Sequence, residues 1–259
     1  MTPQRVAVRW IDGEAQGAPF AYVARPASDP PIGGVLLLHE AFGLNTDIQI
    51  LAGRLAERGY AVLAPDLYRR GPDRLAGYDE RAKAIAMLKT LPDGQVLDDT
   101  ARGLDLLHRE TGGAALGVVG LRIGGRYALL AAAREPGRIR AAVSYYGAGL
   151  DGGTISPLWT LNAIEQVQAL RTPMLLFFVG DDPTVPSAEL DSIDARLRSG
   201  GAAYEIVRYP GVKPGFVFPG RDTYREGEAE DAWNRQLGFL ERNLGRGAPR
   251  ALTGPGATE

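Results

Sequence analysis

Cysteine is absent from this sequence of 259 residues, and histidine occurs only at positions 39 and 108. The lack of cysteine excludes disulfides, thiolate metal sites and cysteine nucleophiles. The sequence also contains no cluster of histidine and acidic residues with the spacing of a metal site. We therefore expect neither a metal nor a cofactor, and any chemistry must rest on carboxylates, arginines, hydroxyls and backbone groups.

Long apolar runs and an excess of charge of one sign are also missing. No uninterrupted apolar stretch approaches the roughly 20 residues needed to span a bilayer, and the opening "MTPQRVAVRW" has no apolar signal core. The formal net charge of −2 provides no electrostatic footprint for nucleic acid. We therefore expect a cytoplasmic protein that binds a small molecule and neither a membrane nor nucleic acid.

Short β-type runs alternate with helical patterns along the chain. Hydrophobic residues make up 45% of it, which suits a globular protein with a large core. The continuous apolar runs in 33–40 and 60–68 are typical of strands buried on both faces, and 46–60 between them has helical spacing. This alternation predicts a mostly parallel central sheet with helices on both faces. We expect one domain over 1–245 and a disordered tail rich in Gly, Pro and Ala over 246–259.

In an open α/β sheet, ligands bind at the carboxyl ends of the strands. The segments that follow the expected strands are "HEAFGLN", "PDLYRRG", "GLRIGG", "YYGAGL", "GDDPTVP" and "YPGVKPGFVFPGRD". In this order they resemble the dienelactone hydrolase family of the α/β-hydrolase fold. The likeness covers nearly the whole chain, with "HEAFGLN" as a specific match and "PDLY" and "YYG" in support, and it implies the α/β-hydrolase fold.

The resemblance also implies where a catalytic triad would lie. The family places its nucleophile in a Gly-x-Cys-x-Gly-Gly turn, and that position is Arg122 here. The family histidine falls on Pro214, whereas the triad acid is retained as Asp182. The carboxylate that partners the resting family cysteine is retained as Glu40. Two of the three triad members are therefore replaced.

One further family residue is displaced. The family uses an arginine shortly after its histidine to hold a substrate carboxylate, and that position is Phe218 here. Arg221 lies near the matching position but not on it.

Arg122 is the apex of a strand that turns sharply into a helix, in "GVVGLRIGGRYALLAAA". A buried unpaired charge is costly, so Arg122 needs an acidic partner, and we expect Glu40. The pair could be structural, or Arg122 could hold a carboxylate or an enolate with its rigid fork of donors. Glu40 and Asp182 are the candidates for proton transfer; burial would raise their pKa and a nearby arginine would lower it.

The oxyanion hole of this fold is built from backbone groups, which survive side-chain replacement. Its donors would be the N–H groups of Ala41 and Ile123. Aromatic side chains in the strand-end segments could line the pocket, although ordinary packing explains each of them too. They are Tyr68, Tyr145, Tyr146 and Trp159, with Arg69 and Arg70 nearby.

A triad at another place would need a serine beside a histidine. His108 lies near a helix end and far from the strand ends, and His39 matches a family residue that is not the general base. Ser144 and Ser187 flank strand ends without a recognisable elbow around either. We expect both histidines to be structural.

Three hypotheses remain open from the sequence. The first is an enzyme that uses the retained pocket for non-hydrolytic chemistry, as a cyclase, isomerase or lyase on an enolisable carbonyl compound. The second is a binding protein without turnover, and the third is a hydrolase with a relocated triad. An open pocket would favour the non-hydrolytic enzyme, and a pocket filled by Arg122 would favour the binding protein. A serine near His39 would favour the hydrolase.

The protein should turn over p-nitrophenyl acetate and dienelactones at negligible rates compared with cysteine-bearing relatives. Losing either a nucleophile or its base typically costs several orders of magnitude in rate, and both are replaced here. Steady-state absorbance assays check this. Robust turnover that a serine or His39 substitution abolishes would instead establish a relocated triad.

Overall fold

The structure is a computed structural model that describes residues 5–12, 19–27, 30–150, 156–168 and 170–245. The predicted tail over 246–259 lies outside these residues. The strands within the described ranges are β1 (Val6–Asp12), β2 (Pro19–Pro26), β3 (Gly33–Leu38), β4 (Tyr60–Pro65), β5 (Leu116–Leu121), β6 (Ile139–Tyr145), β7 (Met174–Val179) and β8 (Tyr204–Tyr209). The helices are α1 (Thr46–Glu57), α2 (Arg81–Leu88), α3 (Asp93–Glu110), α4 (Ile123–Arg134), α5 (Ala163–Val167), α6 (Ser187–Gly200) and α7 (Glu226–Leu244).

All the described strands belong to one sheet, in the order β1-β2-β4-β3-β5-β6-β7-β8. The β1–β2 hairpin and the β2–β4 pair are antiparallel, and every other pair is parallel. The predicted mostly parallel sheet is confirmed. Because parallel strands end at the same edge, the loops after β3, β5, β6, β7 and β8 converge there.

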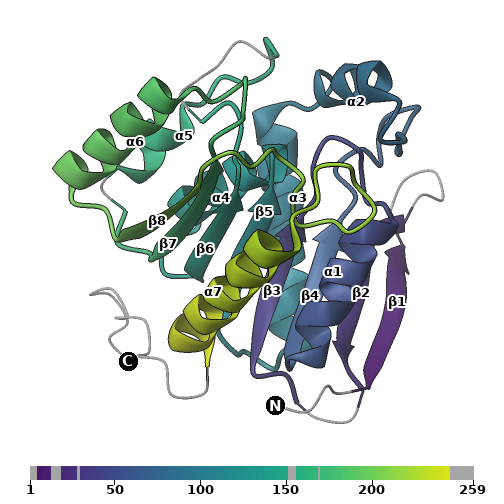
Figure 1. Ribbon diagram of the computed structural model, residues 1–259. Helices are drawn as coiled ribbons and strands as arrows, with labels where there is room; N and C mark the ends of the chain where they lie inside the picture. Colours follow the sequence, from purple (N-terminus) through teal and green to yellow (C-terminus); the bar gives the residue numbers. More distant parts are fainter. Residues whose placement is uncertain (1–4, 13–18, 28–29, 151–155, 169, 246–259) are drawn as a thin grey trace.

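Helices cover both faces of this sheet (Figure 1). α1 and α7 contribute Leu55 and Phe239 to an apolar core on one face. α3, α4, α5 and α6 join a second core on the other face. Figure 1 shows α2 beyond the edge at which the parallel strands end, and its Ala84, Met87 and Leu88 join the second core. None of the described helices is long and apolar enough to cross a membrane.

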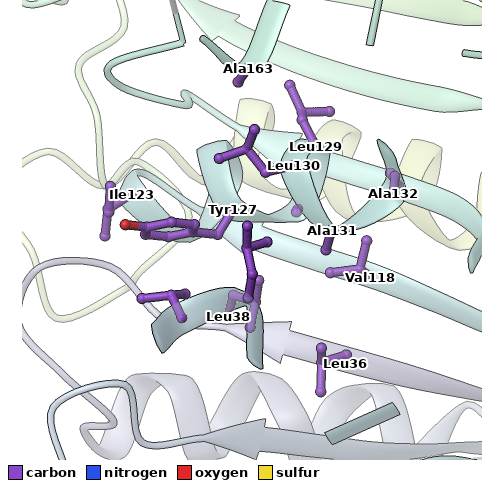
Figure 2. Packing of buried hydrophobic residues seen from close by; sticks show 14 of the residues in the cluster. Leu36, Leu38, Val118, Ile123, Tyr127, Leu129, Leu130, Ala131, Ala132 and Ala163 are labelled. Atoms are coloured by element: carbon purple, nitrogen blue, oxygen red, sulfur yellow. The ribbon is translucent and has the colours of Figure 1, made fainter. Parts of the chain in front are cut away.

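α4 is buried along almost its whole length, from Ile123 to Ala132. Figure 2 shows its side chains between Leu36, Leu38 and Val118 of the sheet and Ala163 of α5. Burying each large apolar side chain contributes roughly 1.5–3 kcal/mol. The turn that precedes α4 is therefore attached to one of the most firmly packed elements of the molecule.

The sequence from about 78 to 110 predicts two helices with a break near "LPDG", and the structure confirms them as α2 and α3, with the break at 89–92. The short helix α5 was not predicted, because five residues show too little periodicity. It begins where the Asn162 side chain accepts a hydrogen bond from the Glu165 N–H group.

A fully buried ion pair ties α4 to the start of α3. Arg126 is not exposed at all, and its guanidinium donates to both carboxylate oxygens of Asp93, at 2.6 and 3.2 Å. Asp93 also accepts from the Tyr127 hydroxyl and from the backbone N–H groups of Thr160 and Leu161. Burial alone would raise the pKa of Asp93, but Arg126 and these N–H groups hold it below its usual value.

Asp93→Ala should lower the free energy of unfolding at pH 7 by about 3–5 kcal/mol, because it leaves the Arg126 charge buried without a partner. The matched control is Asp98→Ala, which removes an exposed ion pair with Arg134 between the same two helices. That change should cost at most about 1 kcal/mol. Urea titrations of the three proteins measure both values.

The same pair predicts a pH dependence. Because folding depresses the pKa of Asp93, its contribution to stability is complete above the unfolded pKa and is lost as the pH falls. The difference between wild type and Asp93→Ala should therefore shrink only below about pH 4. Equal losses for Asp93→Ala and Asp98→Ala at pH 7 would contradict the assignment of the buried pair as a main tether.

Candidate active site

The turn between β5 and α4 consists of Arg122 alone, with φ 55° and ψ −112°. Residues other than glycine rarely adopt such a backbone conformation, and the strain costs on the order of 1–3 kcal/mol. Two glycines permit the close packing around it. A Cβ atom on Gly120 would lie 1.9 Å from the Gly124 carbonyl oxygen, and one on Gly124 would lie 2.2 Å from that of Leu38. This is the geometry of a nucleophile elbow with arginine at its apex.

A cavity of about 590 Å³ opens beside this elbow, at the carboxyl edge of the sheet. Its volume lies within the range of roughly 300–1,000 Å³ that is usual for ligand pockets. Its walls come from the loop after β3, from α2, from the elbow and from the loops after β6, β7 and β8. The lining residues are Glu40, Ala41, Phe42, Tyr78, Arg81, Ala84, Ile85, Leu88, Arg122, Ile123, Ala148, Trp159, Asp181, Pro183, Thr184, Lys213, Pro214, Arg221 and Thr223.

Arg122 lies in the cavity wall and is paired with Asp182, so the expected pairing with Glu40 is wrong. Its guanidinium forms an ion pair with Asp182 and donates to the Thr184 hydroxyl at 2.8 Å. The physical reason is the length of the arginine side chain. Pro214 offers no donor to Asp182, and the Arg122 guanidinium reaches that carboxylate from the elbow. The cavity remains open because the guanidinium is drawn to one side.

Glu40 is paired with Arg221 instead. The Arg221 guanidinium donates to Glu40 Oε1 at 2.6 Å and lies 4.5 Å from the ring centre of Tyr78. No described residue donates to the second carboxylate oxygen, Oε2. Burial raises the pKa of Glu40, and the charges of Arg221 and Arg122 only partly offset this. Glu40 is thus a carboxylate on the cavity wall whose basicity is higher than usual.

The two predicted oxyanion-hole residues, Ala41 and Ile123, both line the cavity. Within the described part of the chain, neither of their backbone N–H groups has a hydrogen-bond acceptor. Ile123 is the first residue of α4, where the helix leaves its first N–H groups without internal partners. The helix dipole adds a partial positive charge at this end. The site therefore offers unpaired donors to a negatively charged oxygen.

Of the predicted aromatic residues, Trp159 lines the cavity directly and Tyr68 supports its wall indirectly. Trp159 lines the cavity, and the Arg126 guanidinium lies 5.0 Å from its ring centre. Tyr68 is not part of the cavity wall. Its hydroxyl donates to the Ala41 carbonyl at 3.1 Å, so it fixes the loop that carries one oxyanion-hole donor.

Tyr145 and Tyr146 do not line this cavity, which corrects their predicted role. Tyr145 is the last residue of β6, and its side chain points to the α1/α7 face, where its hydroxyl donates to the Ala232 carbonyl. Tyr146 has φ 38° and is buried, with its ring centre 5.8 Å from that of Phe216. A strand-end position alone could not reveal to which face each side chain would turn.

Both histidines are placed away from any catalytic role. His39 Nδ1 lies 2.7 Å from the Glu40 carbonyl oxygen, and its Nε2 lies 3.1 Å from the Leu67 N–H nitrogen. Leu67 can donate only to an unprotonated Nε2, so the ring is the neutral tautomer with its proton on Nδ1. Burial lowers the pKa of His39. His108 lies in the last turn of α3, and no described serine or threonine hydroxyl forms a hydrogen bond with His39.

Several cavity residues were not predicted from the sequence. Arg81 at the start of α2 and Lys213 after β8 both line the wall, and neither has an acidic partner among the described residues. α2 also contributes the apolar side chains of Ala84, Ile85 and Leu88. Its helical pattern could be recognised, but its position over the cavity depends on tertiary packing.

A mostly parallel sheet with a sharp strand-turn-helix elbow at its carboxyl edge defines the α/β-hydrolase fold. The chain belongs to the dienelactone hydrolase family, whose model matches residues 20–244. The predicted family and fold are therefore confirmed.

Named relatives and a solved structure agree with this assignment. A Bradyrhizobium protein named "Probable 2-oxo-3-(5-oxofuran-2-ylidene)propanoate lactonase" is 32% identical over 253 residues, which cover 94% of this chain and 98% of that protein. A "Putative carboxymethylenebutenolidase" of Escherichia coli K12 is 32% identical over 87% of this chain and 83% of its own length. The crystal structure of a "Putative Dienelactone Hydrolase" from Klebsiella pneumoniae has a TM-score of 0.83 and 30% identity, covering 92% of this chain and all of that one.

His39 should remain neutral, with its proton on Nδ1, to below the ordinary histidine pKa of about 6.5. The reason is its burial between one acceptor and one donor. Long-range ¹H–¹⁵N NMR of a His108→Gln variant, which leaves a single histidine, measures the tautomer and the titration. A ring protonated on Nε2, or one that titrates above the ordinary value, would contradict the structural role.

Proposed function

We propose that this protein is a non-hydrolytic enzyme, a cyclase, isomerase or lyase, that acts on an enolisable carbonyl compound carrying an anionic group. One observation carries the proposal. A carboxylate with a raised pKa, Glu40, shares a cavity with two unpaired oxyanion donors, while the apex of the elbow holds a guanidinium that cannot attack a carbonyl.

The proposed chemistry begins with removal of a proton from the carbon beside the carbonyl. Glu40 Oε2 accepts this proton, and the electron pair moves onto the carbonyl oxygen, which the N–H groups of Ala41 and Ile123 stabilise. The enolate then follows one of three courses. In an isomerase, the enolate regains a proton at another carbon. In a lyase, it expels a β-substituent, and in a cyclase it attacks an internal electrophile to close a ring.

The anionic group of the substrate is inferred from the cations around the cavity. Arg122 and Arg221 are each matched by a carboxylate, whereas Arg81 and Lys213 lack one among the described residues. A substrate carboxylate would supply the missing negative charge, and arginine binds carboxylates with well-defined geometry. The name of the Bradyrhizobium relative also describes a 2-oxo acid anion.

Hydrolysis is the second candidate, because the named relatives are a lactonase and carboxymethylenebutenolidases. The oxyanion donors would serve an ester carbonyl equally well, with a water molecule as the nucleophile and Glu40 as its base. A relocated Ser–His triad is not supported, because the described partners of both ring nitrogens of His39 are backbone groups. Binding without turnover is the third candidate, and the open cavity accommodates it.

Glu40→Gln should lower the rate of proton exchange at the α-carbon by about 10²-fold or more, the usual contribution of a general base. The assay follows deuterium incorporation from D₂O by ¹H NMR, over a panel of 2-oxo and 3-oxo acids. In the wild type the rate should rise with pH and level off above a pKa higher than that of an ordinary glutamate. Arg122→Ala should weaken both binding and exchange, since it leaves the negative charge of Asp182 on the wall without its cation, against an anionic substrate.

The matched control is Asp181→Asn, which neutralises an exposed carboxylate on the same wall and should leave exchange unchanged. Thermal melts of all variants separate lost chemistry from lost folding. Undiminished exchange in a folded Glu40→Gln protein would refute Glu40 as the base. Binding of oxo acids without accelerated exchange would favour the binding protein, and ester turnover that requires Glu40 would favour the hydrolase.

A further inference from the structure

A second cavity, of about 310 Å³, lies on the face of the sheet that α1 and α7 cover. The loop between β8 and α7 runs over this face (Figure 1) and contributes Phe218 to the cavity wall. Leu121 and Tyr145 form the floor, with Ile50 of α1 and Trp233 of α7 on the sides. None of these side chains lines the main cavity.

Two charged side chains, Arg54 and Asp47, line the second cavity, and neither has an ion-pair partner among the described residues. The Arg54 guanidinium lies 4.2 Å from the ring centre of Trp233, and it has no acidic partner among the described residues. Asp47, the carboxylate at the rim, already accepts a hydrogen bond of 2.5 Å from the Tyr78 hydroxyl. Tyr145 presents only its ring, because its hydroxyl donates to a backbone carbonyl of α7.

Between Asp47 and Arg54, the wall that α1 contributes to this cavity is apolar. That helix buries Ile48, Ala52 and Leu55, whereas Ile50 points away from this buried stripe and is 55% exposed. Ile50 and Leu51 continue the apolar wall outward from the floor. A bound apolar group would therefore remove from water a surface that the fold itself leaves uncovered.

We propose that this cavity is a second binding site, for a small aromatic monoanion such as an aryl carboxylate. The aromatic body fits among Phe218, Tyr145 and Trp233, where ring contacts add to apolar burial. The carboxylate pairs with Arg54 at the rim. The site is distinct from the main cavity and does not depend on the function proposed for that cavity.

The test uses 2-naphthoate and its uncharged isostere 2-naphthalenemethanol as probes, with dissociation constants from isothermal titration calorimetry at millimolar ligand. Arg54→Gln removes the charge, and Ala229→Phe fills the cavity from α7. Arg54→Gln should weaken naphthoate binding by about 10-fold or more, the scale of a lost charge-assisted hydrogen bond, and should leave the alcohol unaffected. Ala229→Phe should abolish binding of both probes.

The matched control is Arg81→Gln, which makes the same change at the main cavity and should leave naphthoate binding unchanged. Thermal melts verify that each variant folds. If Ala229→Phe does not fold, the comparison of the two probes on Arg54→Gln alone decides whether the proposal holds. Three results would overturn the proposal: no binding of naphthoate to the wild type, equal affinity for the acid and the alcohol, or binding lost in Arg81→Gln but retained in Arg54→Gln.

Discussion

The left-handed turn at Arg122 is the constraint on which the geometry of the site depends. It requires backbone contacts so close that Gly120 and Gly124 admit no side chain. The strain is tolerated because the helix that follows is buried and is tied to α3 by Arg126. The turn has two consequences: Ile123, whose N–H group has no acceptor among the described residues, lines the cavity, and the residue at the apex lines the same cavity. The backbone thus keeps its geometry whichever side chain the apex carries.

The electrostatics of the site follow from two carboxylates that each hold one arginine. Asp182 engages Arg122, and Glu40 engages Arg221 through one oxygen only. Each pair is close to neutral, so neither guanidinium projects a full charge into the cavity. The two pairs differ in whether the carboxylate has an oxygen without a hydrogen bond. The Asp182 carboxylate also accepts hydrogen bonds from Thr184, whereas Glu40 Oε2 has no donor among the described residues. This asymmetry distinguishes an anchoring carboxylate from a candidate base.

The sequence predicted the backbone of this site better than its side chains. Buried apolar runs, the glycine-bounded turn and the strand-end rule indicated the edge of the sheet where the site lies. The resemblance to the dienelactone hydrolase family then identified Glu40, Ala41 and Ile123 at that edge. The partner of Arg122 could not be predicted, since it depends on side-chain length and on the space that Pro214 leaves free. The role of Tyr145 was missed for a similar reason: alternation along a strand decides which face a residue occupies, and one residue of register reverses the answer.

The retained triad acid has a different partner, and this limits the possible chemistry. In a triad the acid orients an imidazole that accepts and returns a proton. A guanidinium remains protonated at any physiological pH, so no proton can pass along the Asp182–Arg122 pair. In the proposed function, proton transfer therefore falls to another carboxylate of the described wall. Asp181 is exposed to water, whereas Glu40 is buried and its Oε2 has no donor among the described residues. A reaction that needs one base and an oxyanion hole, but no covalent intermediate, is consistent with all of these pairings at once.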